Sequence, residues 1–85
     1  MANNARVVFT AGFSNRYTNG VREFEVEASN MRGVLKAMDA LFPGLGETLE
    51  EETTVAINGE LHETGYFQAV PEGAEVFFIP RLEGG

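Results

Sequence analysis

The alternation of apolar and polar residues predicts two strands in the first third of the chain. Residues Arg6–Thr10 place Val7 and Phe9 on one side of a strand and Val8 on the other. Residues Val21–Glu27 alternate between apolar side chains and glutamates, so one face of this second strand should meet water. The apolar positions are Phe24 and Val26, and the polar positions are Glu23, Glu25 and Glu27.

The segment between these strands, Ala11–Gly20, is rich in Gly, Ser and Asn, and we predict a loop there. It closes on Asn19-Gly20, which is the strongest local signal for a tight hairpin turn. A type I′ turn needs positive φ at both central positions, and Asn and Gly tolerate this best.

Apolar residues at helical spacing predict one main helix. Their offsets of 0, 3, 4, 7, 10 and 11 match a single helical face. These residues are Met31, Val34, Leu35, Met38, Leu41 and Phe42. Ser29 or Asn30 can cap the start, and Pro43-Gly44 ends the helix. A lone amphipathic helix must pack on the sheet, so this stripe is interpreted as core rather than as a ligand pocket.

The next segment, Leu45–Thr53, is predicted to be a loop that carries Glu47 and the acidic run Glu50–Glu52. Consecutive carboxylates diverge, so a solvated loop is favoured over a metal site. Thr54–Ile57 then reads as a short strand that ends in the turn Asn58-Gly59.

Glu60–Glu63 should return from that turn, and Gly65–Val70 should form an irregular or single-turn link. Pro71–Gly73 turns into the last strand, Glu75–Ile79. Val76 and Phe78 share one face of that strand, and Phe77 and Ile79 share the other. The whole order predicts an α+β domain in which a mixed sheet of four to five strands carries one main helix on one face.

Composition narrows the possible functions. With 85 residues the chain is expected to form one domain, residues 1–80, followed by a flexible C-terminal tail, residues 81–85. Thirteen acids against six bases give a net charge of −7, which argues against a nucleic-acid partner and favours a basic protein partner or simple solubility.

The chain contains no cysteine, which excludes disulfides, thiolate nucleophiles and iron–sulfur clusters. The single histidine, His62, has no second histidine for a metal pair and is expected at the surface. No signal peptide and no membrane-spanning segment are recognised, so the cytoplasm is the expected compartment.

The C-terminal third carries a series of short motifs in a characteristic order. They are Ala56-Ile57-Asn58-Gly59, Pro71-Glu72-Gly73-Ala74-Glu75-Val76, Phe78-Ile79-Pro80 and Gly84-Gly85. Together they resemble the MoaD/ThiS-type sulfur carrier proteins of the ubiquitin-like β-grasp family, and MoaD most closely. Two features depart from the family: Ala74 stands in a turn that often reads Asp-Gly-Asp, and Glu83 precedes the diglycine where small residues are common. Arg81-Leu82 is more similar to ubiquitin.

The resemblance implies a carrier or co-substrate rather than an enzyme. A ubiquitin-activating-type enzyme would use ATP to adenylate Gly85, and the carboxylate would become a thiocarboxylate that gives its sulfur to a synthase subunit. Gly84 and Gly85 have no side chains, so the end of the chain fits a narrow channel. No bound cofactor and no metal are implied. The small subunit of a molybdopterin synthase is the leading version.

Other functions stay open at this stage. The chain could be a protein modifier joined through Gly85 to target lysines, or a carrier for thiamin, tRNA or amino acid sulfur insertion. It could also be a plain β-grasp interaction module.

A docking surface is expected on the sheet face that the helix leaves uncovered. Phe77, Ile79 and Val8 should lie there, unless Phe77 packs beneath the Gly65–Val70 link. Arg81 and Leu82 are expected to bind along the partner's channel. The free protein is expected to be a monomer.

Overall fold

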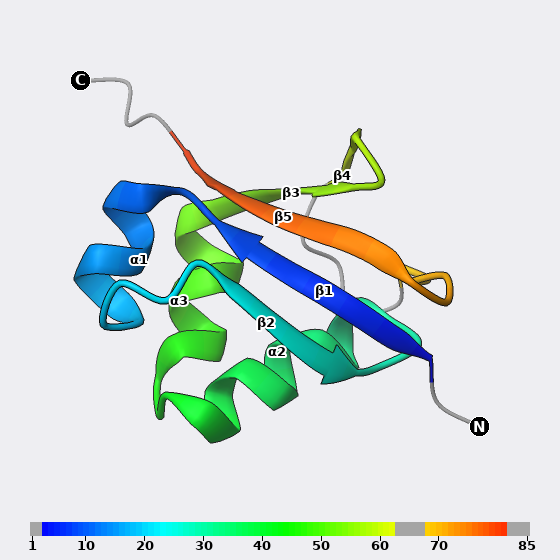
Figure 1. Ribbon diagram of the computed structural model, residues 1–85, viewed down its shortest axis with the longest axis horizontal. Helices are drawn as coiled ribbons and strands as arrows, with labels where there is room; N and C mark the ends of the chain where they lie inside the picture. Colours follow the sequence, from blue (N-terminus) through cyan, green and yellow to red (C-terminus); the bar gives the residue numbers. More distant parts are fainter. Residues whose placement is uncertain (1–2, 63–67, 82–85) are drawn as a thin grey trace.

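The computed structural model describes residues 3–62 and 68–81 of the chain, which form a five-stranded mixed sheet and three helices (Figure 1). The elements follow the order β1 (Asn4–Phe9), α1 (Ala11–Tyr17), β2 (Glu23–Glu27), α2 (Met31–Leu41), α3 (Leu45–Glu52), β3 (Thr53–Ile57), β4 (Glu60–His62) and β5 (Ala74–Pro80). The α2 and α3 helices cover one face of the sheet, and α1 lies at one end of it (Figure 1). No helix in the described part of the chain is long and apolar enough to cross a membrane.

The strand order β2-β1-β5-β3-β4 places β5 in the middle of the sheet. It pairs in parallel with β1, with Val7 opposite Val76, and antiparallel with β3, with Val55 opposite Phe78. Because β1–β2 and β3–β4 are also antiparallel, the sheet is mixed, and the predicted α+β fold with four to five strands is confirmed.

The core lies between the sheet and the helices. Val7, Phe9, Val76 and Phe78 have no exposed surface, as the predicted strand faces require. The Phe9 ring is the centre of this cluster, with its centroid 5.7 Å from that of Phe78. Such ring pairs add to the free energy gained by burying their area.

The predicted main helix is confirmed as α2. Of the two candidate caps Asn30 is used, since its Oδ1 accepts a hydrogen bond of 2.9 Å from the Gly33 backbone N–H. The first four residues of the predicted stripe are buried, whereas Leu41, at the last helical position, is 54% exposed. Phe42 ends the helix and is partly buried, with its ring 5.7 Å from that of Phe24.

The predicted loop over Ala11–Gly20 is wrong for most of its length, because Ala11–Tyr17 forms α1. The Thr10 Oγ1 accepts a hydrogen bond from the Phe13 N–H and caps this helix. Phe13 is buried and stacks on Phe9, with ring centroids 5.1 Å apart. Tertiary packing of one aromatic residue thus overrides the low helix propensity of Gly, Ser and Asn.

The predicted loop over Leu45–Thr53 is also wrong, since Leu45–Glu52 forms α3 and Thr53 begins β3. Leu45 and Leu49, four residues apart, are buried against α2, while most of the glutamates lie on the outer side of the helix. Two apolar residues are enough to hold a short helix when a neighbour covers them, but they leave a weak periodic signal.

Both Asn-Gly pairs have the predicted backbone, but only Asn58-Gly59 forms a hairpin. The predicted hairpin at Asn19-Gly20 is wrong, because this pair follows α1 and its Gly20 N–H donates to the Ser14 carbonyl oxygen of that helix. Asn19 and Gly20 have φ of 55° and 84°, and Asn58 and Gly59 have φ of 51° and 84°. The second turn joins β3 to β4, which ends at His62, while Glu63 and most of the predicted Gly65–Val70 link lie outside the described residues. At the end of that link Val70 is buried.

Candidate partner-binding site

The face of the sheet opposite the helices carries a row of apolar side chains. Val8 lies opposite Phe77, Phe77 opposite Ala56, and Ala56 opposite Leu61, so the row crosses β1, β5, β3 and β4. Directly opposite residues in neighbouring strands point to the same face. Ile79 extends the row toward the end of β5. We call these five residues, Val8, Ala56, Leu61, Phe77 and Ile79, the open-face patch.

Exposure within the open-face patch is graded. Leu61 is 66% exposed, while Val8, Phe77 and Ile79 are half-buried. Ala56 is only 7% exposed but does not belong to the core cluster, because it lies between larger neighbours on the open side. A contiguous apolar patch on a small protein is typical of a protein-interaction surface.

Leu61 and Ala56 were missed by the sequence analysis, although a signal for them exists. A two-residue Asn58-Gly59 turn forces Ile57 to pair with Glu60. The same register then sets Leu61 opposite Ala56, on the face that Phe77 shares. Alternation within a single strand does not reveal this neighbour, because the pairing of strands decides it.

The open face becomes charged toward β2. Glu23, Glu25 and Glu27 are exposed there, as predicted. Arg6 lies between Glu25 and Glu75 in the register, and its Nη2 is 2.9 Å from the Glu75 Oε2. These side chains are about half exposed or more, so the ion pair contributes little stability. These charges border the open-face patch on the β2 side of the sheet.

The tail begins beside this patch. Pro80 pairs with Thr53 at the end of β5. Arg81 then donates its backbone N–H to the Glu52 carbonyl oxygen at 2.9 Å, and its Nη1 to the Glu51 carbonyl oxygen at 3.4 Å. Arg81 is therefore tied to the end of α3. Leu82, Gly84 and Gly85 lie outside the described residues.

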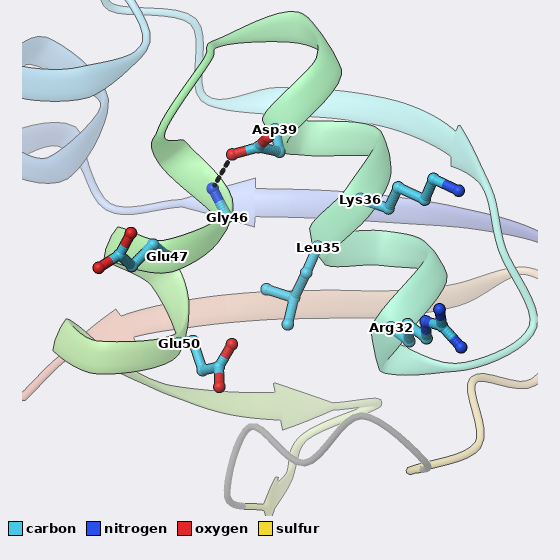
Figure 2. A pocket seen from close by; sticks show the side chains of 7 residues that line it. All are labelled: Arg32, Leu35, Lys36, Asp39, Gly46, Glu47 and Glu50. Carbon is cyan, nitrogen blue, oxygen red and sulfur yellow. Dashed lines mark hydrogen bonds between the residues drawn. The ribbon is translucent and has the colours of Figure 1, made fainter.

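A groove of about 590 Å³ separates α2 from α3 (Figure 2). Arg32 and Lys36 lie on its α2 side, and Glu47 and Glu50 on its α3 side. The Asp39 Oδ1 accepts hydrogen bonds from the backbone N–H groups of Gly44 and Gly46, at 3.1 and 3.0 Å. The groove is thus the corner between two helices that Asp39 fixes, and its lining does not include the start of the tail.

The acidic residues of α3 repel one another. The Glu47 carboxylate is the main cause that raises the pKa of Glu51 above its ordinary value, with smaller contributions from Glu52 and Glu50. Within residues 3–62 and 68–81, no group of three or more His, Cys, Asp or Glu side chains is arranged to hold a metal ion. His62 is partly exposed, with its Nε2 3.2 Å from the Glu60 Oε1.

Solved structures of known proteins share this arrangement. A chain of the Amycolatopsis orientalis BexX/CysO complex superposes with a TM-score of 0.78 at 19% identity, covering 95% of this chain and 99% of that one. The small archaeal modifier protein SAMP1 from Methanosarcina acetivorans gives 0.79 at 18% identity, covering 100% and 99%. A Pyrococcus furiosus protein provisionally assigned as molybdopterin converting factor subunit 1 gives 0.70 at 19% identity, covering 95% and 100%.

The fold is the ubiquitin-like β-grasp. The resemblance to MoaD/ThiS-type sulfur carriers that the sequence predicts is therefore confirmed at the level of the fold. No protein-family model and no curated protein sequence matches the chain. The three matched chains are covered almost completely, so the β-grasp domain accounts for their whole length.

Proposed function

We propose that this β-grasp chain is a sulfur carrier whose C-terminal Gly85 is the reacting group. The observation that carries the proposal is the position of the open-face patch. It runs along β5 to Ile79, so a protein bound on this patch lies against the strand that leads into the diglycine tail. Docking on a rigid domain turns the later chemistry into an intramolecular event, which lowers its entropic cost.

The chemistry starts from a carboxylate, which is a poor electrophile. In a ubiquitin-activating-type partner, an oxygen of the Gly85 carboxylate attacks the α-phosphorus of ATP and pyrophosphate leaves. Hydrosulfide then attacks the carbonyl carbon of the acyl adenylate, AMP leaves, and loss of a proton gives the thiocarboxylate. A persulfide can act in place of hydrosulfide if a thiol then reduces the acyl disulfide. ATP is used by the partner, and the carrier is a co-substrate, not the enzyme.

Among sulfur acceptors, we favour the large subunit of a molybdopterin synthase, with this chain as the small subunit. The Phe78-Ile79-Pro80 ending and the similarity to the Pyrococcus furiosus converting factor support this version. We place the reaction in the cytoplasm, where the activating enzyme and ATP would be available.

A second candidate is a protein modifier that is joined through Gly85 to lysines of other proteins. The similarity to SAMP1, which is described as a small archaeal modifier protein, and the ubiquitin-like Arg81-Leu82 pair favour it. Activation by adenylation is common to both candidates, so the open-face patch serves either one.

Intact-mass spectrometry of the protein isolated from its native host separates the candidates. Replacement of one oxygen by sulfur at Gly85 supports the carrier. Branched Gly-Gly peptides on lysines of other proteins support the modifier. A free carboxylate under all growth conditions would contradict both. Deletion of Gly85 is the matched control, and it should abolish either product while the melting temperature stays almost unchanged.

A further inference from the structure

A cleft of about 380 Å³ lies between α1 and the start of the tail, on the other side of β5 from the open-face patch. The α1 helix contributes Gly12, Phe13, Arg16 and Tyr17 to its lining, and Pro80 and Arg81 contribute from the end of β5. Figure 1 shows α1 beside the carboxyl end of β5. The cleft and the open-face patch therefore lie on two sides of the end of β5, where the tail begins.

Positive charge is concentrated at this cleft although the chain as a whole is acidic. Two of the six basic residues, Arg16 and Arg81, line it, in a chain of net charge −7. The Arg16 guanidinium carbon lies 5.3 Å from the centroid of the Tyr17 ring, and Arg81 donates to a backbone carbonyl oxygen. A ring and a backbone carbonyl carry no net charge, so these contacts leave both guanidinium groups charged. Arg16 and Arg81 are also exposed.

The acidic residue in the lining, Glu52, is engaged within the domain. Its carboxylate accepts a hydrogen bond of 3.4 Å from the Tyr17 hydroxyl, and its carbonyl oxygen accepts one from the Arg81 N–H. These bonds tie α1, α3 and the start of the tail together. The cleft is thus held by three elements and carries more positive than negative side chains.

Gly12 is a second, independent observation. It lies in the first turn of α1, where the structure gives it no positive φ, and a Cβ built on it meets no atom within 4 Å. Glycine is less favourable than alanine in a helix, and no close contact in the structure requires it at this position. What the missing side chain does provide is open space in the wall of the cleft, into which another chain can come close.

We propose that this cleft is a second docking site, which receives an acidic segment of the protein that activates the tail. The inference rests on the proposed function and names the chemistry of that partner. Aspartate or glutamate side chains would pair with the Arg16 and Arg81 guanidinium groups, whose planar forks suit carboxylates. The Phe13 and Tyr17 rings supply apolar surface beside them. A partner bound at both surfaces would hold the tail between them.

The test is the affinity of the full chain for the purified ubiquitin-activating-type enzyme of the same organism, measured by calorimetry at low and high salt. Arg16→Glu should weaken binding roughly tenfold or more at low salt, and the deficit should shrink as salt rises. Arg32→Glu is the matched control, since it reverses another exposed arginine, which lines the α2–α3 groove, and its effect should stay within about twofold.

Gly12→Gln fills the cleft without changing its charge. It should lower affinity several-fold, while the melting temperature stays the same or rises, because the helix loses a glycine. Unchanged affinity in both Arg16→Glu and Gly12→Gln would overturn the proposal. Equal losses in Arg16→Glu and Arg32→Glu would overturn it as well, since only the overall charge would then matter. Self-association of the wild type that Arg16→Glu abolishes would assign the cleft to a second copy and also overturn it.

ATP–pyrophosphate exchange by the wild-type pair keeps the two proposals apart. If the wild-type chain does not stimulate exchange, the proposed carrier function fails. If it does, and the cleft variants behave like the wild type, only the second docking site fails.

Discussion

The two faces of the sheet hold similar side chains but bury them very differently. In β5 the neighbours Phe77 and Phe78 are the same residue type, yet Phe78 has no exposed surface and Phe77 is half-buried. Phe78 packs on Phe9 beneath the helices, whereas Phe77 lies between Val8 and Ala56 on the open face. The covered face therefore supplies the stability of the domain, and we propose that the open face supplies its main interaction surface.

The largest effect should follow from breaking the covered face. Phe78→Ala should lower the free energy of unfolding by about 3–5 kcal/mol, because it removes buried area and leaves a cavity. A domain of this size has only about 5–15 kcal/mol in total, so a large share of its stability would be lost. Urea unfolding followed by circular dichroism measures this loss. A change below about 1 kcal/mol would mean that the core closes around the deletion.

The same truncation on the open face should have a small effect on stability and a large effect on activity. Phe77→Ala should cost less stability than Phe78→Ala, about 1–2 kcal/mol, since Phe77 lies on the open face and is partly exposed already. It should reduce ATP–pyrophosphate exchange with the activating enzyme roughly tenfold or more, as expected for an aromatic anchor near the centre of an interface. Phe78→Ala, assayed where it is still folded, is the matched control. If Phe77→Ala unfolds the protein instead, the residue belongs to the core.

A smaller effect should come from the helix that covers the buried face. Asn30→Ala removes the side-chain acceptor for the Gly33 N–H and should destabilise the domain by about 1 kcal/mol. Exchange activity of the folded variant should stay at the wild-type level, because Asn30 belongs neither to the open-face patch nor to the lining of the cleft beside α1. Thermal unfolding and the exchange assay measure the two quantities together. A loss of activity without a loss of stability would show that the two faces are not independent.

The smallest effect concerns pH. Because Glu47 raises the pKa of Glu51 in the folded state, the folded protein binds that proton more tightly than the unfolded chain does. Stability should therefore fall slightly as the pH rises through the range just above the ordinary pKa of a glutamate. Glu51→Gln should remove this slope, and Glu27→Gln, an exposed glutamate in β2, is the control. Melting temperatures measured across that range test it. Equal slopes in all three proteins would contradict the expectation.

Strong local patterns made much of this fold predictable. The alternation in β5 and the apolar stripe of α2 each repeat at least twice along their element, so the periodic signal is clear. Both Asn-Gly pairs have positive φ, which few other residues adopt. The helices α1 and α3 could not be predicted in this way. Each is held by one or two buried apolar residues, such as Phe13 or Leu49, whose partners lie in other elements: Phe13 stacks on Phe9 of β1, and Leu49 lies in the helix that packs against α2.

The residues of the candidate site also differ in whether a local sequence pattern could predict them. Parity within one strand placed Phe77 and Ile79 on the face opposite Phe78, and the structure puts them there. Leu61 required the strand register, and the cleft beside Arg16 required α1, which the sequence analysis had taken as a loop. Surfaces that several elements build together are the least visible in a single sequence, because no local period encodes them.

The central position of β5 makes the open-face patch depend on completion of the fold. Without β5, β1–β2 and β3–β4 are two separate strand pairs, each with an unpaired edge. Because β1 must wait for a partner almost seventy residues away, this pairing closes a long loop and forms late. A nascent or damaged chain in which β5 is not yet paired thus lacks the assembled open-face patch. An activating enzyme that binds this patch, as we propose, would not bind such a chain.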